Sequence, residues 1–123
     1  MPPSAITAGD VVMVALPSHL PPGHEQEGRR PAVVVGIPSE PLRFPVVYIV
    51  PLTSQFGAWA RKNPMMYPVL PPGTGGLPLV SVALLDQMRG LDVRRVRDYL
   101  GTSRPDEYRP IGEGLQQAVA FAL

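Results

Sequence analysis

Three short polar segments of the sequence carry the side chains best suited to chemistry. They are residues 23–31 (GHEQEGRRP), residues 50–55 (VPLTSQ) and residues 81–89 (SVALLDQMR). Each segment adjoins an apolar run, and a buried strand can hold polar groups in fixed positions. His24 has an intrinsic pKa of about 6.5 that suits proton transfer, and Arg30 offers a planar fork of donors that suits phosphate.

The elements that must position these segments follow from the apolar runs and the turn residues. The 17 prolines among 123 residues favour short strands and long loops, because proline breaks helices and is confined to strand ends, edges and bulges. The expected strands are residues 11–16, 32–37, 44–53, 67–70 and 79–85, with long loops at 17–29 and 55–63. This pattern predicts a mainly β fold, a small closed barrel forming one domain over residues 1–123.

The C-terminal part of the chain contains an ambiguous stretch and an expected helix. Residues 92–99 fit either a helix or a strand. A terminal helix is expected to follow, with Ser103 as its N-cap, and to run to Leu123. Pro110 and the glycines after it predict a kink or a late start of this helix.

Two strand runs, residues 33–35 and 46–50, are apolar on both faces. One small barrel cannot bury both faces by itself, so the second face needs either the terminal helix or another subunit. A homodimer is the simpler solution, and a helix that covers both runs is the alternative.

The composition limits the classes of partner and of chemistry. The net charge is only +1, so no strong overall field indicates a nucleic-acid partner, although ten of the eleven basic residues are arginine. There is no cysteine, which excludes disulfides, thiolate nucleophiles and zinc-thiolate sites. The longest apolar run, residues 45–52, is too short to cross a bilayer. We expect a cytoplasmic protein with no membrane span, no metal and no cofactor.

In this order and at these spacings, the three polar segments resemble the MazF/PemK family of toxin endoribonucleases. The patterns are GHEQxGxRP, PLTSQ and SVALLDQxR, and Gly9 and Asp10 precede the first expected strand. The resemblance implies an SH3-like barrel with long loops and a C-terminal helix, and a homodimer. It also implies the toxin of a type II toxin–antitoxin system, which cleaves single-stranded mRNA selectively and without a metal. A cognate antitoxin would block its RNA groove.

The resemblance further implies that Arg30 and Thr53 carry catalysis, and their chemistry agrees with that role. When the 2′-hydroxyl of RNA attacks the neighbouring phosphorus and expels the 5′-oxygen, negative charge builds on the phosphoryl oxygens. Arg30 can donate two charged hydrogen bonds there, and Thr53 can donate its hydroxyl. A guanidinium, with a pKa above about 12, is a poor base, so Arg30 is expected to stabilise charge.

Two residues are candidates for accepting the 2′-hydroxyl proton, namely His24 and Glu25. His24 has the more suitable pKa, and a solvated loop histidine is its alternative interpretation. Glu25 alternatively orients Arg30 through a salt bridge. His19 is expected to be an ordinary loop residue.

RNA bases are expected to be read by the second loop and by Arg89. Single-stranded RNA is recognised by stacking bases on aromatic rings and by bonding their edges. The candidates are Gln55, Phe56, Trp59, Arg61 and Arg89. The two aromatic residues alternatively form a hydrophobic plug or a protein contact, and Gln55 alternatively makes a local turn bond. An ion pair between Asp86 and Arg89 would support the site, while Arg94, Arg95 and Arg97 are expected to be solvated.

The functional alternatives are a non-catalytic toxin, such as a topoisomerase poison, and a barrel retained only as a binding module. The joint presence of Arg30 and Thr53 favours the nuclease over both. The sequence departs from the family pattern at Leu20-Pro21-Pro22, which lengthens the first loop, and at Pro110 in the expected helix.

Overall fold

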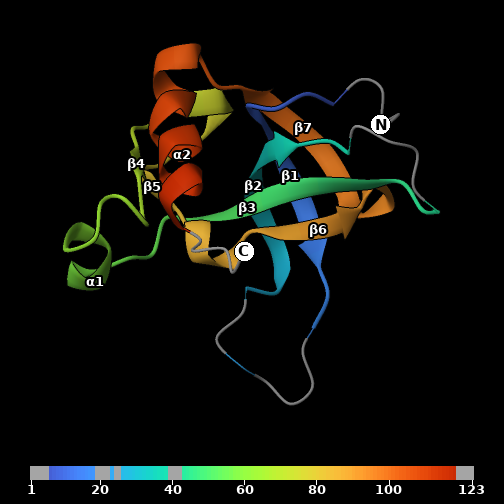
Figure 1. The fold of residues 1–123 in the computed structure, drawn as a ribbon, viewed down its shortest axis with the longest axis horizontal. Coiled ribbons are helices and arrows are strands. Elements are labelled where there is room, and N and C mark those ends of the chain that lie inside the picture. The colour runs from blue at the N-terminus through green and yellow to red at the C-terminus, as the bar shows by residue number, and fades with distance from the viewer. Residues whose placement is uncertain (1–5, 19–22, 24–25, 39–42, 119–123) are drawn as a thin grey trace.

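The computed structural model describes residues 6–18, 23, 26–38 and 43–118 of the chain. This part consists mainly of β-strands, with one longer helix at its C-terminal end (Figure 1). In chain order the elements are β1 (Asp10–Leu16), β2 (Gly28–Gly36), β3 (Val46–Thr53), α1 (Ala58–Arg61), β4 (Val69–Leu70), η2 (Thr74–Gly76), β5 (Ser81–Ala83), η3 (Leu85–Gln87), β6 (Arg89–Asp92), η4 (Val93–Arg95), β7 (Val96–Thr102) and α2 (Pro105–Ala118), where η marks a 3-10 helix.

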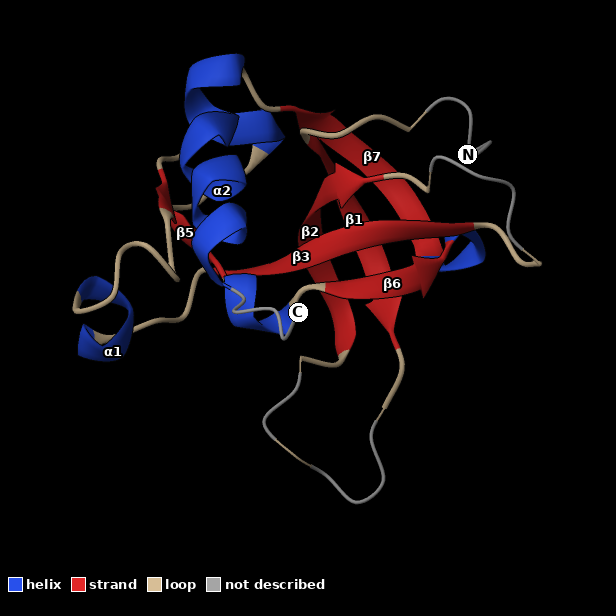
Figure 2. Ribbon diagram, viewed as in Figure 1, coloured by secondary structure: helices blue, strands red, loops and turns tan. Residues whose placement is uncertain are grey.

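The strands form one curled antiparallel sheet in which β3 has neighbours on both edges. On one edge β3 pairs with β2, and the sheet continues through β1 to β7. On the other edge it pairs with β6 along residues 46–49 and with β5 at Leu52 and Thr53. The chain passes from β6 to β7 through η4, and within the described residues no ladder joins these two strands. The sheet is therefore a half-barrel with a C-terminal helix (Figure 2), which confirms the expected mainly β fold but not a fully closed ring.

Two apolar cores lie on opposite faces of β1, β2 and β3, because successive residues of a strand point to opposite faces. The core inside the curl includes Val12, Val14, Ala32, Val34, Val47, Ile49, Leu91 and Val93. The core on the outer face includes Val11, Val33, Val50, Leu52, Leu70, Ala83, Leu85 and Ile111. Since α2, β4, β5 and η3 contribute to the outer core, the chain itself covers the second face. The helix alternative is thus correct for this face, whose burial requires no second subunit.

Short segments differ most from the expected elements. The expected loop 55–63 contains α1, which is anchored by the buried Ala60. The expected strand 79–85 is reduced to β5 and followed by the turn η3, and residues 92–99 comprise the last residue of β6, then η4 and the first part of β7. The strand β2 already begins at Gly28, so Arg30 lies within a strand instead of at the junction between the loop and the strand.

The helix α2 begins at Pro105, so the predicted late start is wrong. Ser103 does not cap it, because the Ser103 hydroxyl donates to the carbonyl oxygen of Gly9 at 2.8 Å. The Glu107 carboxylate instead accepts from the backbone N–H of Arg104 at 2.8 Å, which satisfies one free donor of the first turn. The expected continuation of the helix over residues 119–123 lies outside the described residues.

The backbone of the turn η2 packs directly against the backbone of β7, with no side chain between them. A Cβ atom on Gly101 would be only 2.7 Å from both the carbonyl carbon and the carbonyl oxygen of Gly75. Gly75 and Gly76 themselves have φ values of 51° and 81°, a region that residues with a Cβ rarely adopt. Glycine is therefore required at these positions, and the contact fixes where the following segment, residues 77–79, leaves the turn.

Candidate functional site

The site forms where β3 exchanges one partner strand for another. β2 and β3 are paired as far as Ala32 and Pro51, after which β3 pairs with β5 through Leu52 and Thr53. If the register of β2 and β3 continued for two more residues, Arg30 would stand opposite Thr53. The strands separate at this point, and a cavity lined by residues of both opens there.

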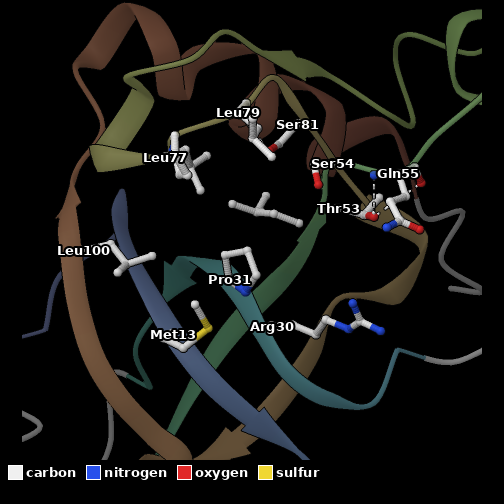
Figure 3. A pocket seen from close by; sticks show the side chains of 12 residues that line it. Met13, Arg30, Pro31, Thr53, Ser54, Gln55, Leu77, Leu79, Ser81 and Leu100 are labelled. Carbon is white, nitrogen blue, oxygen red and sulfur yellow. Dashed lines mark hydrogen bonds between the residues drawn. The ribbon is translucent and has the colours of Figure 1, made fainter.

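This first cavity has a volume of about 200 Å³ and two chemically different sides (Figure 3). Arg30, Thr53 and Gln55 lie together on its polar side. Its apolar lining consists of Met13, Pro31, Leu52, Leu77, Pro78, Leu79 and Leu100. The first cavity thus offers charged and neutral hydrogen-bond donors to an anion, next to an apolar surface.

Arg30 and Thr53 are both held by local hydrogen bonds. The exposed Arg30 donates from Nε to the carbonyl oxygen of Glu27 at 3.1 Å, and its guanidinium extends on the side of Thr53 and Gln55 (Figure 3). Thr53 Oγ1 accepts the backbone N–H of Gln55 at 3.1 Å and donates to the Gln55 carbonyl oxygen at 3.3 Å. The donated N–H polarises the hydroxyl, whose proton can turn from this long bond to an anion.

A second cavity of about 190 Å³ adjoins the first and is mostly polar. Thr53 and Gln55 line both cavities, so the two lie next to each other at the end of β3. The remaining lining residues of the second cavity are Gln26, Trp59, Tyr67, Leu84, Asp86 and Gln87.

Three residues give the second cavity an aromatic wall with a carboxylate beside it. The rings of Trp59 and Tyr67 meet edge to face with their centroids 5.0 Å apart, and Trp59 is 49% exposed. The Tyr67 hydroxyl donates to Asp86 Oδ2 at 2.7 Å. This hydrogen bond, followed by burial and the charge of Asp86, raises the pKa of Tyr67 above its usual value. Tyr67 therefore stays protonated and acts as a fixed donor to the carboxylate.

The structure brings together four of the predicted site residues and places others elsewhere. Arg30, Thr53, Gln55 and Trp59 line the two neighbouring cavities. Phe56, Arg61 and Arg89 line neither cavity. His24 and Glu25, the predicted proton acceptors, lie outside the described residues.

The three residues that do not line the cavities have other surroundings. Phe56 packs on the small core around Ala60, and the guanidinium of Arg61 lies 5.6 Å from the centre of its ring. Arg89 is the first residue of β6 and stands opposite Ile49. The placement of Phe56 agrees with its alternative interpretation as a packing residue.

The interpretation of Asp86 from the sequence alone is wrong. No ion pair of the described residues joins Asp86 to Arg89, and the Asp86 carboxylate instead accepts the Tyr67 hydroxyl. Tyr67, Gln26 and Gln87 were not recognised as site residues. The available signal was that Gln26 and Gln87 both belong to the polar segments on which the family resemblance depends.

The arginines near η4 line a separate hollow on the surface. Arg94 donates to both carboxylate oxygens of Asp92, at 3.1 Å to Oδ1 and 2.9 Å to Oδ2. These bonds lower the pKa of Asp92 to about 2. Arg94, Arg95 and Arg97 are all exposed, in agreement with a solvated face.

Among the residues that the structure describes, no group of three or more His, Asp or Glu side chains is arranged to hold a metal ion. Within the same residues, no helix has the length and apolar character needed to span a membrane.

Comparison with solved structures shows similar folds over most of the chain. A MazF structure from Deinococcus radiodurans is 25% identical with a TM-score of 0.68, and the match covers 92% of this chain and 94% of that one. An endoribonuclease in complex with its cognate antitoxin, from a mycobacterial species, is 19% identical with a TM-score of 0.67, covering 95% and 99%. The toxin MazF-mt6 of Mycobacterium tuberculosis is 14% identical with a TM-score of 0.60, covering 89% and 94%.

Comparison of sequences assigns the family. No curated protein sequence matches the chain. The family model of PemK-like, MazF-like toxins matches residues 7–119, which include every residue of both cavities. Because this match spans nearly the whole chain, the protein belongs to the PemK-like, MazF-like toxins of type II toxin–antitoxin systems.

Proposed function

We propose that this toxin is an endoribonuclease that cleaves single-stranded mRNA at selected sequences without a metal ion. The observation that carries this proposal is the placement of Arg30 and Thr53, from two different strands, in one cavity at the point where the strands part. A phosphodiester in the first cavity would meet a charged fork from one strand and a hydroxyl donor from the other.

The proposed reaction is an internal transfer of the phosphoryl group. The ribose 2′-oxygen loses its proton and bonds to the adjacent phosphorus, while the bond from phosphorus to the 5′-oxygen breaks and that oxygen takes up a proton. The products are a 2′,3′-cyclic phosphate and a 5′-hydroxyl. Arg30 and Thr53 donate to the non-bridging oxygens as their charge grows, and each such donor contributes about 10²–10³ in rate.

The remaining groups of the proposed machinery move protons and hold bases. His24 and Glu25 are the proposed proton acceptors and immediately precede Gln26, which lines the second cavity. Gln55 and Trp59 are proposed to contact bases from the walls of the cavities. Outer contacts to RNA are proposed for Phe56, Arg61 and Arg89.

The proposal includes a cognate antitoxin and a homodimer. The apolar side of the first cavity next to Arg30 suits a protein segment with apolar and acidic side chains, which would exclude RNA from the site. The mycobacterial endoribonuclease of similar fold was solved with its cognate antitoxin. Partly exposed apolar side chains such as Ile37, Tyr48 and Met88 leave surface for contact with a second copy. Light scattering on the toxin, alone and with its antitoxin, would measure both associations.

The experiment that tests the nuclease activity uses the purified protein free of antitoxin. We expect it to cut a long single-stranded RNA in excess EDTA and to leave cyclic-phosphate and 5′-hydroxyl ends. Arg30→Ala should abolish most of this cleavage. Arg29→Ala is the matched control, because Arg29 is the adjacent arginine but pairs with Asp98 at 2.9 Å and lines neither cavity.

Intact RNA after incubation with the wild-type protein would rule out the nuclease. Cleavage only when a divalent ion is supplied would refute the metal-free mechanism. If cells expressing Arg30→Ala were still arrested in growth as strongly as with the wild type, arrest would arise from binding, as in the non-catalytic alternative.

A further inference from the structure

The second cavity presents a carboxylate whose position is fixed. Asp86 lies in the short turn η3 and accepts the Tyr67 hydroxyl at 2.7 Å. Tyr67 is itself braced by its edge-to-face contact with Trp59. The exposed Asp86 thus keeps accepting capacity toward the cavity, since each carboxylate oxygen has two lone-pair directions and only one of the four is used by Tyr67.

The position of this carboxylate relates it to the proposed scissile phosphate. Thr53 and Gln55 line both cavities, so the second cavity lies next to the first. A nucleotide whose phosphate is bonded to Thr53 can place its base in the second cavity, beside the partly exposed ring of Trp59. Bases of single-stranded RNA are commonly held in this way, stacked on an aromatic ring and bonded along the edge.

A fixed carboxylate discriminates between bases by the donors on their edges. Guanine alone among the RNA bases has two adjacent donors, N1–H and the N2 amino group, on its Watson–Crick edge, and one carboxylate can accept both in parallel. Adenine and cytosine place an acceptor beside their amino group, and uracil has an acceptor on each side of its N3–H. Those acceptors would face the negative charge of Asp86 at a cost in binding.

Gln26 provides a second contact that holds the turn η3 in place. Its backbone N–H donates to Gln87 Oε1 at 2.7 Å, which ties the segment before β2 to η3. Its side-chain oxygen is buried and, in the described part of the chain, has no hydrogen-bond donor. This oxygen is closed off from the second cavity, so what Gln26 contributes is its bond to Gln87, which helps to hold η3 and the Asp86 carboxylate in place.

We propose that Asp86, positioned by Tyr67, selects a guanine base next to the scissile phosphate. This inference rests on the proposed ribonuclease function and adds to it the base that the second cavity takes. Asp86 acts in specificity and has no part in the transfer of the phosphoryl group.

The test is cleavage of an RNA library with a randomised stretch by the purified full-length protein, followed by sequencing of the 5′ ends. We expect guanine to be enriched at one position adjoining the cut. Asp86→Asn should remove this enrichment and leave the other positions unchanged, because an amide offers a donor where the guanine edge also has donors. Tyr67→Phe should weaken the same enrichment, since it keeps the ring but releases the carboxylate. Asp98→Asn is the matched control and should leave the pattern unchanged, because Asp98 is an exposed carboxylate paired with Arg29 outside both cavities.

A second measurement uses only the wild-type protein and so does not depend on the folding of a variant. A short RNA with inosine in place of the selected guanine keeps N1–H but lacks the amino group, and it should be cut about ten- to a hundredfold more slowly. Equal cleavage of the two RNAs would overturn the inference, and so would a library in which guanine is enriched at no position next to the cut. Neither result would contradict the proposed ribonuclease activity. Failure to cut any RNA would instead refute the proposed function itself.

Discussion

Replacing Arg30 and Thr53 separately and together tests whether the two side chains act on one phosphate. Loss of a single donor to the transition state typically costs about 2.7–4 kcal/mol, or 10²–10³ in rate. If Arg30→Ala and Thr53→Val acted independently, the double variant would lose about 10⁴–10⁶. Both residues line the same cavity, so we expect the loss in the double variant to fall short of that product by at least about tenfold, or 1.4 kcal/mol. The reason is that a phosphate no longer held by Arg30 makes less use of Thr53.

The assay is single-turnover cleavage of one defined RNA under conditions where binding is saturated. Thr53→Ser is the matched control, because it retains the hydroxyl that accepts the Gln55 N–H, and it should keep most of the rate. Thermal unfolding should confirm that the variants are folded: Arg30 is exposed and its hydrogen bond to Glu27 is worth about 1 kcal/mol, or roughly 4 °C in Tm. Strictly multiplicative rate losses would show that the two donors do not converge, and the mechanism would then be refuted.

Two further predictions concern stability. In α2, Gly114→Ala should lower the free energy of unfolding by about 1–3 kcal/mol, because the new Cβ would lie 2.5 Å from Leu85 Cδ1 and 2.6 Å from the Met65 carbonyl oxygen. Gly112→Ala, whose Cβ would meet only Tyr108 Cε1 at 3.6 Å, should raise it by about 0.5–1 kcal/mol, and similar urea midpoints for the two variants would contradict the packing of this helix. The hydrogen bonds from Arg94 lower the pKa of Asp92 from 3.8 to about 2, so its contribution to stability is present above pH 4 and is lost as the pH falls toward 2. Asp92→Asn should therefore flatten the stability profile in that range, and parallel profiles for variant and wild type would count against the pairing.

Local signals in the sequence were sufficient for the long elements. The apolar runs predicted β1, β3 and the buried part of β2, because these segments are buried on both faces and leave little ambiguity, whereas the exposed start of β2 at residues 28–30 was not predicted. Pro110 lies inside α2 and does not delay its start, contrary to the expectation from the sequence. Its missing N–H would have bonded to the carbonyl of Asp106, and since both residues are exposed, water can satisfy that carbonyl without a break in α2.

The short elements and their contacts were not accessible in the same way. The segments that form η3 and η4 have no periodicity long enough to distinguish a 3-10 turn from a strand or a loop. The candidate site could be predicted at Arg30 and Thr53, because both residues belong to the sequence patterns that resemble the family. The bond from Tyr67 to Asp86 joins the segment before β4 to η3 across 19 positions of sequence, and no spacing rule connects the two residues.

The contact between Gly75 and Gly101 has a consequence for ligand discovery. Leu77 and Leu79, on the apolar side of the first cavity, directly follow the turn η2. The main chain of this turn rests on the main chain of β7. No side chain at that contact can change its rotamer to make room. The main chain that carries Leu77 and Leu79 therefore cannot move back, and the apolar side keeps its width. A series of inhibitors that grows by one methylene at a time should gain affinity up to a sharp size limit and then lose it abruptly, unlike a series directed at a pliable pocket.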